Sequence, residues 1–335
     1  MLCGHVASAN VTLTESKRKF EGAERTVVHI ENEKIIVEIV PELEGRVIKY
    51  QDKSKPHTGF EWLDDCPYHY GGRWEGVPFS YKIDSKGPDR AAITVSGGGK
   101  VAVALLHQLT GVDVANPLDL KVERTMSVVP NSTKLQIDVK ITNVGEGVAP
   151  QFRYMVHAVF GQAPPMKDGR AFWFLPTGKS VEFFDSKRGE HEMGIAAGGA
   201  PVDHPFSRFV PGRKADKPRY IAGGWGALLT SAGPVYIEYD AKQYDFMQFW
   251  FGGDAEWHYT FEPHTKPIDL KPGESTTCSY ALAYDSKEVA FGGMTVAFAP
   301  PIVPEVLLPG ATLKIQTRGT TVRDRAEKAS LRFDA

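Results

Sequence analysis

Three segments of this 335-residue chain bring acidic, imidazole and aromatic side chains together on or beside expected strands. A carboxylate and an imidazole that face one small molecule can serve as general base and general acid. Aromatic rings stack on the apolar C–H faces of a sugar ring, although about half of the tryptophans are expected to pack the core instead. These residue types therefore predict a carbohydrate site. The segments are CPYHYGGRWEGVPF (66–79), QFRYMVHAVFG (151–161) and QFWFGGDAEWHYTFEPHTKP (248–267).

The strand that carries Glu262 differs from a solvent-facing strand. Alternation places Thr260 on the same face as Glu262, and the aromatic residues Tyr259 and Phe261 on the opposite face. Pro263 removes a donor from the strand ladder and biases the preceding residue toward an extended backbone, so the strand ends at a fixed point. We therefore expect the Glu262 carboxylate at the rim of a sheet, facing a pocket, with a solvated acid as the alternative.

His157 lies on an apolar strand in the second segment. Alternation places it on one face with Arg153 and Met155, and places Tyr154 and Val156 on the other. A histidine in such a strand is often a core residue with a satisfied hydrogen bond, and this remains the alternative. The sequence around it, with an aromatic residue three positions later, favours a functional His157.

Almost every periodic segment of the chain alternates with a period of two, and helical periodicity is hard to find. Many short strands with Gly- and Pro-rich turns and no helices between them predict an all-β protein. The number of strands favours one large antiparallel two-sheet β-sandwich. We expect residues 1–20 to be a flexible N-terminus or signal remnant, 21–317 a single sandwich domain, and 318–335 a C-terminal tail. The long stretch 183–220 lacks sustained alternation and is expected to border the site.

The composition excludes several classes of partner. The net charge is −2 with dispersed basic residues, which argues against nucleic acid. No apolar stretch approaches the roughly 20 residues of a membrane-spanning helix, so we expect no membrane insertion. The residues Ala7-Ser8-Ala9 resemble a signal-peptidase site and favour a periplasmic or secreted protein, but a basic leader region is absent. The three cysteines show no metal-ligand spacing.

The order of three motifs resembles the galactose mutarotase-like (aldose 1-epimerase) superfamily. IIVEIVPELEGRVIKYQDK (35–53) resembles the opening strands of that family. The pair of strands in 124–161 resembles the segment that leads to its catalytic histidine, and YTFEPHTKPIDLKPGES (259–275) resembles the strand with its catalytic glutamate. The match extends over roughly residues 25–285 in order. It implies the large two-sheet sandwich called the galactose mutarotase-like supersandwich.

Carried over by position, the resemblance implies Glu262 as general base and His157 as general acid. His69 is an approximate counterpart of a second family histidine and is the third expected catalytic residue. Glu44-Gly45 replaces a Gly-Gly pair ahead of Arg46. The acidic residue that contacts the sugar could be Asp240 or Asp245, and we select the latter. The expected substrate-binding residues are Arg46, Arg73, Trp74, Arg153, Asp245 and Trp250.

The implied function is a sugar mutarotase or epimerase, an isomerase acting on a mono- or oligosaccharide without a cofactor or metal. One alternative is a polysaccharide lyase or another carbohydrate-processing enzyme on the same fold, because the fold hosts several chemistries. Another is a carbohydrate-binding protein without catalysis. A metal site of two histidines and a glutamate, His69, His157 and Glu262, remains possible in principle, but no short ligand spacing supports it. The sequence does not indicate the oligomeric state.

Overall fold

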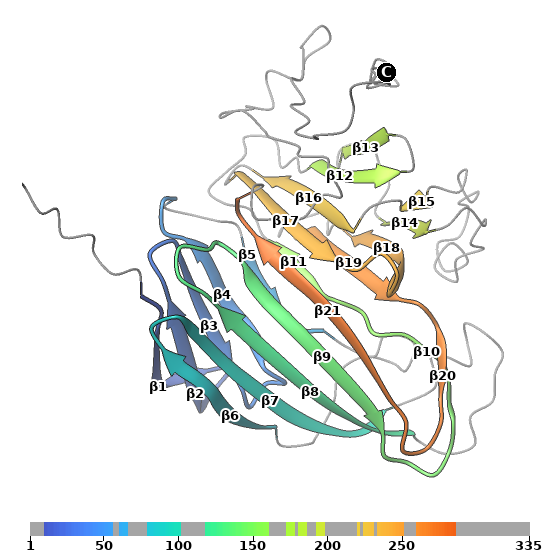
Figure 1. Ribbon diagram of the computed structural model, residues 1–335, viewed down its shortest axis with the longest axis horizontal. Coiled ribbons are helices and arrows are strands. Elements are labelled where there is room, and N and C mark those ends of the chain that lie inside the picture. Colours follow the sequence, from blue (N-terminus) through green and yellow to red (C-terminus); the bar gives the residue numbers. More distant parts are fainter. Residues whose placement is uncertain are drawn as a thin grey trace, which may run out of the picture.

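The structure is a computed structural model, and it describes eleven parts of the chain. All regular structure in these parts is β-strand, as the alternation predicts. The strands form two large sheets and one small two-stranded sheet (Figure 1). All the strand pairs are antiparallel except β14–β15. The described parts are residues 10–55, 60–65, 79–101, 118–160, 172–177, 180–185, 192–197, 220–221, 224–230, 233–250 and 259–285.

The strands of each sheet come from distant parts of the sequence. The ten-stranded sheet contains, in spatial order, β1 (Thr12–Phe20), β2 (Ala23–Glu31), β3 (Ile35–Val40), β4 (Arg46–Asp52), β5 (Phe60–Leu63), β11 (Ala158–Phe160), β19 (Tyr259–Thr265), β18 (Tyr244–Trp250), β14 (Glu192–Ala197) and β15 (Tyr220–Ile221). The nine-stranded sheet contains β13 (Ser180–Asp185), β12 (Phe172–Thr177), β16 (Trp225–Thr230), β17 (Gly233–Tyr239), β21 (Ser275–Ala283), β9 (Leu135–Asn143), β8 (Leu118–Val128), β7 (Arg90–Val101) and β6 (Ser80–Gly87). The small sheet pairs β10 (Ala149–Phe152) with β20 (Ile268–Leu270).

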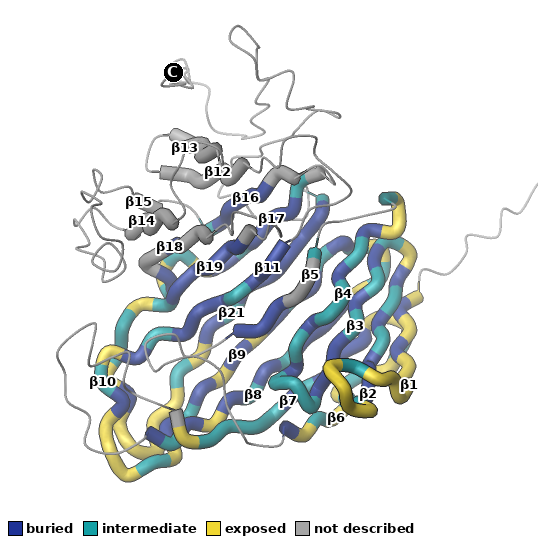
Figure 2. The backbone as a smooth tube through the Cα atoms, turned by 180° about the vertical axis from the view of Figure 1, so that it is seen from behind, coloured by how far each residue is buried: buried dark blue, intermediate teal, exposed yellow. Residues whose placement is uncertain are grey.

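The main core is built from alternate residues of both large sheets. Along β9, the residues at every second position from Leu135 to Ile141 are fully or almost fully buried, while Asp138 and Lys140 between them are exposed. Strands β3 and β4 contribute buried side chains from the other sheet, including Val37 and Tyr50, and Figure 2 shows this alternation along the tubes. Complete burial of one such aliphatic side chain contributes about 1.5–3 kcal/mol to folding.

The N-terminal domain boundary differs from the sequence prediction. Residues 1–20 were expected to be a flexible segment, but Thr12–Phe20 form β1 and pair with β2 along its whole length. The strand is exposed and carries the charged run Glu15–Lys19, which is typical of an edge strand that must avoid further pairing. The expected boundary between 317 and 318 lies outside the described residues.

The expected excursion at 183–220 contains β14 and parts of two further strands, β13 and β15. Strand β14 pairs with β18 and extends the ten-stranded sheet, and β13 pairs with β12 at the edge of the other sheet. The remainder of this stretch lies outside the described residues. Its expected place beside the site therefore stays a prediction.

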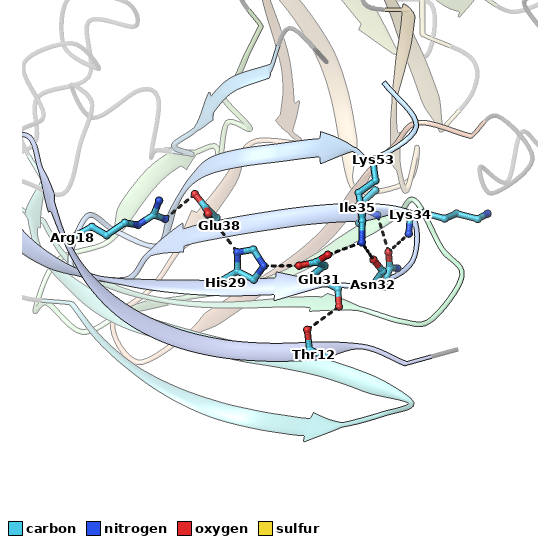
Figure 3. Close-up of polar contacts among 9 residues, drawn as sticks. All are labelled: Thr12, Arg18, His29, Glu31, Asn32, Lys34, Ile35, Glu38 and Lys53. Atoms are coloured by element: carbon cyan, nitrogen blue, oxygen red, sulfur yellow. Dashed lines mark hydrogen bonds and ion pairs between the residues drawn. The ribbon is translucent and has the colours of Figure 1, made fainter. Parts of the chain in front are cut away.

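The turn between β2 and β3 is fixed by Asn32, which is 3% exposed. Its carboxamide oxygen accepts hydrogen bonds from the backbone N–H groups of Lys34 and Ile35. Its Nδ2 donates to the carbonyl groups of Val129 and Ser132, near the turn between β8 and β9. One buried side chain thus shapes the turn, as Figure 3 shows, and also joins the ends of two sheets.

Beside this turn, side chains of β1, β2 and β3 and of Lys53 after β4 form a network of hydrogen bonds and ion pairs (Figure 3). The imidazole of His29 lies 3.0 Å from Glu31 and 3.4 Å from Glu38. Arg18 pairs with Glu38 at 2.7 Å, and Lys53 pairs with Glu31 at 2.5 Å. Pairs that remain partly open to solvent contribute about 0–1 kcal/mol each, so this network makes only a small contribution to stability.

The turn before β4 has a left-handed backbone at two successive residues, Glu44 (φ 62°) and Gly45 (φ 71°). Only glycine adopts this conformation without a steric cost, which explains why a Gly-Gly pair suits the position. A Cβ on Gly45 would also lie 3.1 Å from Val95 and 3.2 Å from Met126 of the opposite sheet. The turn therefore packs directly against the nine-stranded sheet.

We expect Gly45→Ala to lower the free energy of unfolding by about 2–4 kcal/mol, because it adds both backbone strain and overpacking. Gly273→Ala is the matched control, since Gly273 has a φ of 77° and no atom within 4 Å of its would-be Cβ. The control should cost only about 1–2 kcal/mol from the strain. Urea denaturation measures both values, and equal losses would contradict the packing of the turn.

Candidate functional site

The register around β11 aligns two of the three predicted catalytic residues, His157 and Glu262. Ala158 pairs with Phe261 of β19 on one side and with Leu63 of β5 on the other, both antiparallel. The residue before Ala158 therefore stands opposite the residue that follows each partner, and a bridge between Met155 and His264 keeps the same register. Gln248 of β18 pairs with Glu262. Val47 of β4 pairs with Leu63, so Arg46, the residue before Val47, stands opposite Asp64. The resulting row across five neighbouring strands is Arg46, Asp64, His157, Glu262 and Gln248.

His157 and Glu262 face each other across this register. The distance from Nε2 of His157 to Oε1 of Glu262 is 3.9 Å. The side chain of Glu262 is 5% exposed and that of His157 is 27% exposed, so the imidazole is the more accessible partner. A small molecule that reached the imidazole would thus meet an acid and a base side by side.

The other nitrogen of His157 contacts a carboxylate that the sequence analysis did not identify. Nδ1 lies 2.6 Å from Oδ1 of Asp64, whose side chain is 1% exposed, and the imidazole N–H donates to this oxygen. The backbone N–H of Asp64 donates to the carbonyl oxygen of His157 at 3.1 Å, which fixes the two residues at the backbone as well.

The surroundings raise the pKa values of both His157 and Glu262. Burial opposes the charged imidazolium, but the hydrogen bond to Asp64 and the charges of Glu262, Asp64 and Asp65 outweigh it and raise the pKa of His157. Burial raises the pKa of Glu262, while the charge of His157 and a hydrogen bond from Thr260 act in the opposite direction. The arrangement thus favours a protonated imidazole beside a carboxyl group that releases its proton less readily than usual.

Asp65 turns in the opposite direction, into the space between the sheets, and anchors the site there. Its carboxylate accepts hydrogen bonds from the hydroxyl groups of Tyr154 (2.8 Å) and Tyr280 (2.5 Å), and from the backbone N–H of His157 (3.2 Å). Arg124 of β8 lies 3.7 Å from it, and both charged side chains are almost completely buried. Burial disfavours the charge of Arg124, but Tyr154, Asp65 and Tyr280 raise its pKa overall, so it stays protonated.

Arg46 and Arg153, two predicted sugar-binding residues, both have protein partners. Arg46 donates to Glu21 at 2.7 Å and lies 3.7 Å from Asp64, so it joins the row from the β4 side. Arg153 donates to the carbonyl oxygen of Thr265 at 2.9 Å. Arg46 is therefore close to the acid–base pair, and Arg153 is bound to the backbone of β19. Their roles toward a sugar stay predictions.

The other predicted site residues are only partly covered by the described chain. Asp245 and Trp250 lie on β18, the strand that pairs with β19 and its Glu262. Their side chains are not among those described. His69, Arg73 and Trp74 lie outside the described residues, so their expected places at the site stay predictions.

Asp64 and Asp65 are the residues that sequence reasoning missed. They directly follow β5 and precede the segment 66–79 that drew attention for its aromatic and basic residues. Consecutive residues of an extended chain point to opposite sides, so one carboxylate can face the site and the other the core. Two adjacent acids at the end of an apolar strand were the signal that could have found them.

Within the described ranges, no group of three or more histidine, cysteine, aspartate or glutamate side chains has a geometry suited to a metal ion. The alternative metal set includes His69, which these ranges do not cover. The same ranges contain no helix with the length and hydrophobicity of a membrane span.

Two comparisons with solved structures, each with a TM-score above 0.5, identify the fold. A structure from Klebsiella pneumoniae, assigned provisionally as an aldose 1-epimerase, matches with a TM-score of 0.54 at 12% identity, over 83% of this chain and 84% of that chain. The Slr1438 protein of Synechocystis matches with a TM-score of 0.52 at 11% identity, over 81% of this chain and 100% of that chain. A galactose mutarotase-like protein from Clostridium acetobutylicum gives 0.47 at 10% identity, over 81% and 98%.

The chain has the galactose mutarotase-like fold. This fold confirms the predicted all-β two-sheet sandwich and the architecture that the sequence resemblance implied. At such low identity the likeness establishes the architecture and not the activity. No family model matches the sequence, and no curated protein matches it significantly.

We expect Arg124→Met to lower the free energy of unfolding by about 3–5 kcal/mol, because it leaves the buried carboxylate of Asp65 without its positive partner. Lys121→Met, on the same strand, is the control, because Lys121 is exposed and pairs with Glu123 at the surface. That change should stay within about 1 kcal/mol. Similar losses in urea denaturation for the two variants would contradict the anchoring role of the Asp65 network.

Proposed function

We propose that this protein is a sugar mutarotase or epimerase that interconverts the two anomers of an aldose. The observation that carries the proposal is the direct pairing of a buried carboxylate with a more accessible imidazole, Glu262 with His157, at 3.9 Å. The two oxygens that exchange protons in this reaction, the anomeric hydroxyl and the ring oxygen, are bonded to the same carbon. A base and an acid that lie close together suit this substrate.

In the proposed reaction, the Glu262 carboxylate takes the proton of the anomeric hydroxyl while Nε2 of His157 gives a proton to the ring oxygen. The bond between the anomeric carbon and the ring oxygen breaks, and the open-chain aldehyde forms. After rotation about the C1–C2 bond, the hydroxyl that was the ring oxygen attacks the other face of the aldehyde and returns its proton to His157. Glu262 returns its proton to the new anomeric oxygen, so both residues end in their starting states.

The lyase alternative has less support among the described residues. A lyase needs positive charge that can neutralise a uronate carboxylate, and Arg46 and Arg153 are engaged by Glu21 and by a backbone carbonyl. The alternative of a sugar-binding protein without turnover keeps the same residues, and the experiment below separates it from the enzyme.

We expect Glu262→Gln and His157→Asn each to lower kcat/KM for anomer interconversion about 100- to 10,000-fold, because each removes one proton-transfer group. Polarimetry or NMR of freshly dissolved aldoses gives the rate above the uncatalysed background. Glu274→Gln is the matched control, since Glu274 is exposed in the turn before β21 and should leave the rate unchanged. If the wild-type protein binds sugars but does not accelerate anomer interconversion of any common aldose, the result favours the alternative of a sugar-binding protein without catalysis.

The proposed reaction needs an ionised Glu262 and a protonated His157, so kcat/KM should follow a bell-shaped pH profile. Activity is lost as the pH falls and Glu262 takes up a proton, and burial moves this limb above the ordinary value of 4.5. Activity is lost as the pH rises and His157 loses its proton, and the nearby carboxylates move this limb above 6.5. Because Glu262 and His157 interact, the two apparent pKa values of the profile describe the pair and not either residue alone. If kcat/KM did not change with pH on either the acidic or the alkaline side, the assignment of Glu262 as base and His157 as acid would be excluded.

A further inference from the structure

Two consecutive acids, Asp64 and Asp65, hold His157 from two directions. Asp64 contacts Nδ1 of the imidazole at 2.6 Å, and Asp65 accepts the backbone N–H of the same residue at 3.2 Å. Both acids are buried, at 2% and 0% exposure. His157 is therefore held both at its imidazole ring and at its backbone N–H, by carboxylates that are buried from solvent.

The two ring nitrogens of a histidine are distinct, and their neighbours influence which of them carries the proton. A neutral histidine carries its proton on either nitrogen, and the partner of one nitrogen decides which. A buried carboxylate that accepts from Nδ1 keeps the proton there, which leaves Nε2 as the site of exchange. Nε2 is the atom that faces Glu262 at 3.9 Å.

Several charged groups around His157 influence whether its imidazole is protonated. Glu262 faces it from β19, and Asp64 and Asp65 face it from the end of β5. Arg46 stands behind Asp64 at 3.7 Å and Arg124 stands behind Asp65 at 3.7 Å. His264 lies two residues beyond Glu262 on β19, opposite Met155. Three nearby carboxylates, two of them with cationic partners of their own, leave the imidazolium as the favoured state.

We infer that Asp64 is a positioning residue for the acid–base step: it holds the proton on Nδ1 of His157 and aims Nε2 at the substrate. This inference rests on the proposed function. It matters because His157 must give a proton in ring opening and take it back in ring closure. With Nδ1 held by Asp64, the same nitrogen performs both transfers without a ring flip.

The contact can be tested directly by NMR of histidine-labelled protein, without any sugar. In the wild type, we expect neutral His157 to carry its proton on Nδ1 and to titrate above 6.5. Asp64→Asn should lower the pKa of His157 and shift the neutral ring toward the Nε2–H form. Asp64→Glu should restore the Nδ1–H form at least in part. Asp138→Asn, the same chemical change at an exposed site on β9, should alter neither property.

The kinetic arm uses the same variants. Asp64→Asn should lower kcat for anomer interconversion about 10- to 100-fold, the usual effect of removing a carboxylate that orients a functional histidine. Its alkaline limb should move to lower pH, while KM changes little. A residue with only a structural role would change stability without moving this limb, and thermal unfolding of each variant reports that separately.

The possible outcomes separate the two proposals. Unchanged tautomer, pKa and pH profile in Asp64→Asn would overturn the inference and leave the proposed function standing. Wild-type protein with the Nδ1–H tautomer but no activity on any aldose would overturn the proposed function, and with it the catalytic meaning of the contact. If Asp64→Asn fails to fold, the wild-type tautomer and the Asp64→Glu variant still decide, because an Nε2–H form in the wild type contradicts the inference.

Discussion

The candidate site depends on one imidazole held between two carboxylates on neighbouring strands. His157 contacts Asp64 through Nδ1 and faces Glu262 through Nε2. The attraction between a cation and two anions is stronger where the charges are shielded from bulk solvent, and both acids are buried. The register of β11 between β5 and β19 brings the three groups together. A shift of one residue in either pairing would turn a carboxylate to the other face of the sheet.

The second constraint is the network behind the site, which links it to the opposite sheet. Asp65 accepts hydrogen bonds from Tyr154 and Tyr280 and stands beside Arg124, and Arg124 also donates to the carbonyl oxygen of Glu44 at 3.2 Å. Buried polar groups are costly unless they are satisfied, so such a network favours one arrangement of the strands over others. The fold and the acid–base pair therefore share residues: the same Asp65 that anchors the core also holds the backbone of His157.

The sequence predicted the fold class for a physical reason that is local, whereas His157 and Glu262 were selected mainly through the resemblance to a known family. Alternation with a period of two reports which face of each strand is buried, and the motifs around His157 and Glu262 identify the strands that carry them. Asp64 was not predicted, because its contact with His157 spans 93 residues and depends on strand pairing that no local pattern records. Strand β1 was missed because its exposed, charged side chains resemble a flexible tail, although its backbone pairs with β2 throughout.

The most direct test of the central claim is a crystal structure of the protein with a bound aldose. The account predicts that the anomeric oxygen lies within hydrogen-bonding distance of the Glu262 carboxylate and that the ring oxygen lies within the same distance of Nε2 of His157, with Asp64 still on Nδ1. A sugar bound away from this pair, or one that presents its non-reducing end to it, would contradict the account.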